Sequence, residues 1–225
     1  MFTPKFIKFF KDLAKNNNRE WFNEHKPDYQ QYVVQPMGEF IEAMAPKLKR
    51  ISPHFIADPK PHGGSMFRIY RDVRYAKDKS PYKLHAACQF RHELGKDAHT
   101  VGFYVHISPQ EAVFGGGIWL PPNEELSKIR NTIVDNPTEW QRIKSSAKVR
   151  ELFGGIGGDG LVRPPRGFDA QHEHLEDLKR KSFFLMRNEP ADIILDGGFI
   201  DEVEKTFKAA KPFMEYICYA QGVEI

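Results

Sequence analysis

Basic side chains are concentrated in one short segment of the sequence, residues 68–83. The segment holds six basic and two acidic residues, a charge of +4 against a total of +3, so the rest of the chain sums to −1. Arginine presents a planar fork of donors that matches phosphate or carboxylate, and lysine adds a point charge. The segment is therefore a candidate anion site, with the candidate ligand-binding residues Arg68, Tyr70, Arg71, Arg74, Lys79 and Lys83.

Alternating apolar and polar residues predict the strands that would position these side chains. The alternation runs through residues 83–91 and 101–108, and more briefly through residues 67–70. Because successive side chains of a strand point to opposite faces, the polar positions of neighbouring strands should share one face of a sheet. The residues expected on that polar face are Arg68, Tyr70, Lys83, His85, Tyr104 and His106.

Two histidines on this face could move a proton near neutral pH, which makes His85 and His106 the candidate catalytic residues. Positive neighbours disfavour a protonated imidazole, so both are expected to be neutral at pH 7. The sequence does not specify a reaction, and whether the protein is an enzyme stays open.

A run of three glycines and a tryptophan lies in the predicted strand 112–120. Glycine weakens a strand, so the run indicates a bulge or a close approach of other atoms. A ligand over the sheet or a tightly packed helix would explain it equally well. Gly116 is the candidate for ligand approach, and Trp119 would form a wall of the site together with Tyr70 and Tyr104. Trp21 could also cover the polar face, whereas Phe22 is expected in the core.

Three functions agree with these residues. The leading hypothesis is a protein that binds a small anionic ligand, phosphorylated or carboxylated, in a concave site. The second is a nucleic-acid-binding module that uses residues 68–83 with stacked aromatic side chains, and it predicts an open groove and a steep salt dependence. The third is a structural or interaction protein, in which each arginine is bonded to an aspartate or glutamate.

Two stretches of the sequence resemble cofactor-binding or metal-binding motifs, but the residues around them do not fit such a site. The spacing Gly155-x-Gly157-x-x-Gly160 matches a dinucleotide fingerprint, but a proline follows it instead of a helix. His172 and His174 lack the i, i+4 spacing of a zinc-binding helix. No cofactor and no metal site are therefore expected.

The period of the hydrophobic pattern divides the chain into three parts. Residues 1–50 show a helical period, residues 65–120 the period of strands, and residues 123–225 helices with one added strand near 182–186. The prediction is one α+β domain over residues 1–225, with a central, mainly antiparallel sheet of about four strands flanked by N-terminal and C-terminal helices. Pro212 is expected to divide the last helix.

Composition narrows the class of protein. With 225 residues, 40% hydrophobic and 13% aromatic, the chain is too apolar to be disordered, and no apolar run is long enough to cross a membrane. Its two cysteines do not form a disulfide framework, which favours a cytoplasmic, soluble protein without membrane partners. The oligomeric state stays open.

Several segments together resemble the uncharacterised family called domain of unknown function 2461. They are Asn17–Phe22, Phe67–Tyr75, Lys77–Lys83, Gly115–Trp119, Arg163–Asp169 and Leu178–Phe183. The resemblance covers nearly the whole chain and departs after Asp169, where Ala170 and Glu173 stand in place of expected prolines. It implies one domain and a widespread bacterial protein, but no established reaction and no catalytic residues.

Overall fold

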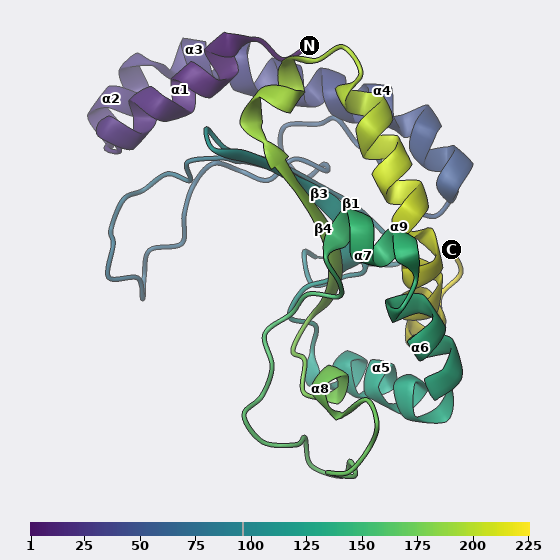
Figure 1. Ribbon diagram of the computed structural model, residues 1–225. Helices are drawn as coiled ribbons and strands as arrows, with labels where there is room; N and C mark the ends of the chain where they lie inside the picture. The colour runs from purple at the N-terminus through teal and green to yellow at the C-terminus, as the bar shows by residue number, and fades with distance from the viewer. Residues whose placement is uncertain (96) are drawn as a thin grey trace.

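A four-stranded antiparallel sheet packs against N-terminal and C-terminal helices (Figure 1). The computed structural model describes residues 1–95 and 97–225. The strands lie side by side in chain order: β1 (Ala86–Arg91), β2 (Gly102–Ile107), β3 (Glu111–Ile118) and β4 (Phe183–Pro190). The architecture is α+β, as predicted, and β4 is the added strand that the sequence predicts near 182–186. The sequence also predicts a short, polar connection at residues 93–100 between the first two strands, and it includes Lys96, which lies outside the described residues.

The N-terminal helices follow the predicted apolar stripes. They are α1 (Pro4–Lys15), α2 (Arg19–Glu24), α3 (Lys26–Tyr29), the π-helical turn η1 (Gln30–Val34) and α4 (Gln35–Ile51). Pro4 opens α1, where its missing N–H breaks no helical hydrogen bond. Phe6, Phe10 and Leu13 recur at helical spacing and are fully buried.

Two asparagines and a phenylalanine attach α2 to the chain just before β1. The Asn18 side chain accepts a backbone hydrogen bond at 3.0 Å in the first turn of α2 and so caps it. The Asn17 side chain exchanges two hydrogen bonds, of 3.0 and 3.1 Å, with the backbone of Tyr82. Phe22 is buried, as expected, and stacks on the Tyr82 ring with 4.1 Å between centroids. These contacts fix the position of Lys83, the next residue.

The C-terminal part continues with α5 (Asn123–Asp135), α6 (Pro137–Lys144), α7 (Ala147–Phe153), α8 (Leu175–Leu178), the 3-10 turn η2 (Ala191–Leu195) and α9 (Phe199–Gln221). The prediction that Pro212 divides the last helix is wrong, because α9 runs through it. Pro212 removes a hydrogen bond to the Lys208 carbonyl, but it lies on the exposed side of α9, where water can solvate that carbonyl.

A buried carboxylate holds the segment that leads into β4. Asp177 accepts hydrogen bonds from Trp140 Nε1 at 2.9 Å, Lys144 Nζ at 2.9 Å and Arg180 Nε at 3.1 Å. Asp177 and Trp140 are both buried. Because the carboxylate is fully bonded, it joins α6 to α8 without leaving an unpaired buried charge.

One face of the sheet is covered by α9 and the opposite face is not. Phe207 of α9 stacks on Phe103 of β2 with 4.5 Å between ring centroids, and α4 packs beside α9. The side chains that point to this covered face include Cys88, Phe90, Phe103, Val105, Ile107, Ala112, Phe114 and Leu185, all fully buried. The alternation within β1 and β2 is thus confirmed.

The predicted strand at 67–70 is not part of the sheet. The segment makes only isolated bridges, Met66 with Cys88 and Tyr70 with Tyr82, so it runs along β1 as an irregular edge. β1 also begins at Ala86, later than predicted, and Leu84 is therefore 38% exposed. The coil between α4 and β1 extends away from α9 (Figure 1). None of the described helices is long and apolar enough to cross a membrane.

Candidate functional site

A pocket of about 390 Å³ lies on the face of the sheet that α9 leaves uncovered; we call it the open-face pocket. All four strands and the coil before β1 contribute to it. Its lining consists of Phe67, Lys83, His85, Ala87, Gln89, Ala98, Gly102, Tyr104, Val113, Gly117, Ile118, Trp119, Phe184 and Met186. The size and the mainly apolar lining, with a few polar groups, are typical of a site for a small molecule.

Lys83 is the cation of the open-face pocket. Its Nζ donates a hydrogen bond to the Arg68 carbonyl at 3.1 Å and lies 5.5 Å from the centre of the Phe67 ring. Burial, and then the positive charge of Arg68, lowers the pKa of Lys83 below its usual value. No described carboxylate lies within 4.0 Å of either cation. An anion bound here would offset both the desolvation and the repulsion.

The two candidate histidines form a stacked pair. Their ring centroids are 4.1 Å apart and the planes differ by 21°. Burial lowers the pKa of His85 to about 4, with smaller contributions from His106 and Lys83. Burial also lowers the pKa of His106. Both imidazoles are neutral at pH 7, as expected, but burial and not like charge is the main cause. Only His85 lines the pocket.

Tyr104 and Gln89 lie opposite each other on β2 and β1. Burial raises the pKa of Tyr104 to about 12, so its hydroxyl stays protonated. Gln89 is 8% exposed, and its Nε2 donates to the carbonyl of Thr100 at 3.0 Å and of Ala98 at 3.4 Å. Its Oε1 is buried and has no hydrogen-bond partner among the described residues. Gln89, which lines the open-face pocket, thus carries an acceptor that no described residue satisfies.

Most of the basic segment is paired within itself. Arg71 binds Asp78 at 2.5 Å, and Arg74 binds Asp72 at 2.7 Å. Lys79 Nζ donates to two backbone carbonyls of the same segment, at 2.9 and 3.3 Å. None of these three cations lines the open-face pocket, so the structure does not bring them together with Lys83 there, and their binding of an anion stays a prediction. The two aspartates of the segment thus pair with Arg71 and Arg74, whereas Arg68 has no described acidic partner.

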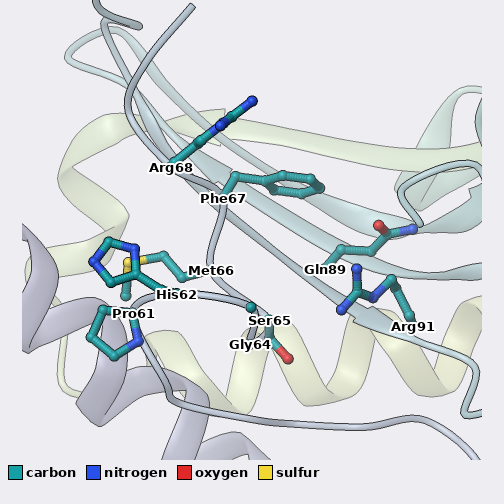
Figure 2. Close-up of a pocket in the computed structure, with 10 residues that line it drawn as sticks. Pro61, His62, Gly64, Ser65, Met66, Phe67, Arg68, Gln89 and Arg91 are labelled. Carbon is teal, nitrogen blue, oxygen red and sulfur yellow. The ribbon is translucent and has the colours of Figure 1, made fainter. Parts of the chain in front are cut away.

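A second pocket of about 370 Å³ lies beside Phe67 (Figure 2). The coil 61–68 lines it together with Gln89 and Arg91 of β1. Phe67 and Gln89 line both pockets, so the two pockets are adjacent. The guanidinium of Arg68 is directed away from Gln89 and Arg91 (Figure 2). Arg68 accordingly acts on the open-face pocket through its charge near Lys83 and through its carbonyl.

Two other aromatic residues lie elsewhere than expected, and a third lies as expected. Tyr70 is 52% exposed and lies beside Tyr82, outside the open-face pocket. Trp21 stacks on His25 with 4.0 Å between centroids and does not cover the sheet. Trp119 does line the pocket, as predicted, and lies 5.5 Å from the Phe184 ring.

The glycines of β3 serve close packing. A Cβ on Gly116 would lie 2.7 Å from the Met214 sulfur of α9, so Gly116 faces the core and does not line the open-face pocket. A Cβ on Gly115 would lie 1.8 Å from the Leu185 carbonyl oxygen, and one on Gly117 2.2 Å from that of Phe183. The neighbouring strand, in addition to the helix, therefore requires this run of glycines.

Sequence reasoning missed several residues of the open-face pocket. Phe67 was expected on the buried face, but Met66 takes the buried place opposite Cys88 and Phe67 turns to the open face. Phe184 and Met186 carry no local signal, because the partner of β4 in the sheet is distant in sequence. Gln89 could have been found, since it occupies a polar position of the alternating segment 83–91.

Comparison with known proteins agrees with the resemblance described above. No curated protein and no solved structure matches the chain. The sequence pattern of a family described as conserved hypothetical protein (DUF2461) matches residues 5–216, which include every strand and the whole open-face pocket. The chain therefore belongs to the DUF2461 family of conserved hypothetical proteins.

Proposed function

We propose that this protein binds a small organic anion, carboxylated or phosphorylated, in the open-face pocket. The apolar body of the ligand would lie against Phe67, Tyr104 and Trp119, and its anionic group would bind the ammonium of Lys83. The observation that supports this most is Lys83 itself, a half-buried cation beside Arg68 with no described carboxylate within 4.0 Å. A charge-assisted hydrogen bond to Lys83 would supply affinity and orientation.

The lining also favours a ligand with few charges. Lys83 is the only described lysine or arginine that lines the open-face pocket, because Arg71, Arg74 and Lys79 are engaged elsewhere. A polyphosphate would need several such cations. An aromatic or branched apolar acid with one anionic group therefore fits better. The neutral His85 would offer one further hydrogen bond, and its role in proton transfer, with His106, stays a prediction.

Thermal unfolding and calorimetry with a panel of aromatic carboxylates and phosphate monoesters test the proposal. A ligand that binds only the native state raises the melting temperature. Lys83→Met should weaken binding about tenfold or more, the effect of losing a charge-assisted hydrogen bond. Lys77→Met is the matched control, since it removes the same charge from an exposed position of the same segment and should bind like the wild type.

Two results would overturn the proposal. One is a panel in which no compound shifts the melting temperature. The other is equal binding by Lys83→Met and the wild type. Binding of single-stranded oligonucleotides with a steep salt dependence would favour the nucleic-acid hypothesis instead.

We also propose a cytoplasmic location. It is supported by the two cysteines of the chain, Cys88 and Cys218, which are both buried and unpaired with each other. Fractionation of cells should recover the protein with cytosolic markers, and recovery from an oxidising compartment would contradict this.

A further inference from the structure

We propose that the open-face pocket selects ligands that carry an N–H or O–H donor on their apolar body, and that Oε1 of Gln89 accepts this hydrogen bond. The inference rests on the proposed function, because it names the class of small organic anion that the same pocket prefers. Lys83 would bind the anionic group, and Gln89 would accept a hydrogen bond from a second, neutral group of the same molecule.

The orientation of the Gln89 amide is fixed by the protein. Its Nε2 donates to two backbone carbonyls, of Thr100 at 3.0 Å and of Ala98 at 3.4 Å. Carbonyl oxygens only accept hydrogen bonds, so rotating the amide by 180° would set Oε1 against two acceptors. Figure 2 shows the nitrogen of Gln89 on the side away from Phe67. The oxygen is therefore held in place as an acceptor.

The neighbouring strand is built to admit this amide. Gly102 of β2 lies beside it, and a Cβ at that position would be 3.2 Å from Gln89 Nε2 and 2.7 Å from the Phe90 carbonyl oxygen. Any larger residue at position 102 would press on the amide and on the backbone of β1. Gly102 thus leaves the space that the Gln89 amide occupies at the wall of the pocket.

The Gln89 oxygen is desolvated without compensation from the protein. The side chain is 8% exposed, and no described residue donates to Oε1. A buried acceptor without a donor lowers stability, and a bound group that supplies the donor recovers the lost interaction. A ligand of equal size that lacks the donor leaves the acceptor unpaired. This difference, more than contact area, sets the preference.

Phe67 connects the two polar contacts. Its ring centre lies 5.5 Å from Lys83 Nζ, and Phe67 and Gln89 line the open-face pocket together. A flat ring placed against Phe67 would therefore have a cation at one edge, and the Gln89 amide belongs to the wall of the same pocket. The ligand class that satisfies all three contacts is an aromatic acid with a ring N–H or a phenolic O–H.

Matched pairs of ring systems test this inference. Indole-2-, indole-3- and indole-5-carboxylate each have a benzothiophene counterpart, in which sulfur replaces the N–H at nearly the same size. Calorimetry on the wild-type protein should show at least one indole acid that binds about tenfold or more tightly than its counterpart. This comparison needs no variant and does not depend on the folding of one.

Gln89→Met then assigns the preference. Methionine has a similar length but a poor acceptor, so the preference for the indole acid should disappear. Lys83→Met is the control, because it should weaken both members of a pair alike and keep their ratio. Circular dichroism verifies that each variant is folded.

The outcomes separate this inference from the proposed function. If the members of every pair bind the wild type equally, the inference is wrong and the proposed function stands. If Gln89→Met keeps the preference for the indole acid, another group accepts the hydrogen bond of its N–H and the inference is wrong. If no member of any pair binds and no other acid of the panel does, the proposed function fails and the inference fails with it.

Discussion

The two faces of the sheet take their residues from the same four strands, yet they differ in chemistry. Phe103 and Tyr104 are neighbours on β2, but Phe103 lies against Phe207 of α9 and Tyr104 lines the open-face pocket. The covered face is uniformly apolar along β1 and β2. Among the described residues, the open face retains a glutamine oxygen without a donor, a lysine without an acidic partner and two neutral histidines. Stability is therefore concentrated on one face, and the proposed binding site lies on the other.

The largest expected effect compares neighbouring aromatic residues of β2. Phe103→Ala removes a fully buried ring and should lower the free energy of unfolding by about 3–5 kcal/mol. Tyr104→Ala empties part of a pocket that is already open, and should lower it by about 1 kcal/mol. Urea unfolding of both variants measures the difference. Equal losses would mean that the open face contributes to the core as much as the covered face does.

The next effect concerns the glycines of β3. Gly115→Ala would place a methyl group against the backbone oxygen of Leu185, which cannot move alone, and should destabilise by about 3 kcal/mol. Gly116→Ala meets first the flexible Met214 side chain, so a loss of about 1 kcal/mol is expected. Denaturant midpoints rank the two variants. The reverse order would show that helix packing, and not strand packing, selects these glycines.

The reliability of sequence reasoning also differs between regions. The alternation in residues 101–108 places Phe103 and Tyr104 correctly, because a covered face and an open face impose a period of two. Residues 67–70 alternate too, but they pair through isolated bridges, and Phe67 turns to the opposite face from the one predicted. The pairing of Arg71 with Asp78 depends on a turn that carries no periodic signal. The sheet was thus predictable, but of the residues predicted for the site only Lys83, His85, Tyr104 and Trp119 line the open-face pocket.

The third effect is a loss of stability at mildly acid pH. The pKa of His85 is about 4 in the folded protein, below its usual value of 6.5. Between these two values the unfolded chain binds a proton that the folded chain does not, so stability present at pH 7 is lost as the pH falls from 6.5 to 4. A loss of about 2 kcal/mol is expected at pH 5.

His85→Phe tests the origin of this loss. Phenylalanine can still stack on His106 but does not titrate, so the variant should lose less stability between pH 7 and pH 5 than the wild type. Urea unfolding at both pH values measures each free energy. The same pH dependence in variant and wild type would place the titrating group elsewhere, outside the open face.

The smallest expected effect belongs to the self-paired part of the basic segment. Arg74 and Asp72 form an exposed ion pair at 2.7 Å, and exposed pairs contribute little because water and salt screen them. Arg74→Gln should change neither the denaturant midpoint nor the affinity for the acids that bind the wild type. A clear loss of affinity would mean that Arg74 takes part in anion binding, and that the site includes the self-paired part of residues 68–83 as well as Lys83.

The hydrogen bond from Trp140 to Asp177 has a consequence for spectroscopy. The indole of Trp140 is fully buried and bonded to a carboxylate, whereas Trp119 is 52% exposed at the wall of the pocket. Iodide in solution can therefore quench the fluorescence of Trp119 but not that of Trp140, and Trp21 lies between these extremes. A bound acid that covers Trp119 would shield it from iodide while the emission of Trp140 stays constant. One emission spectrum thus contains both a reporter of occupancy and an internal reference for the folded core.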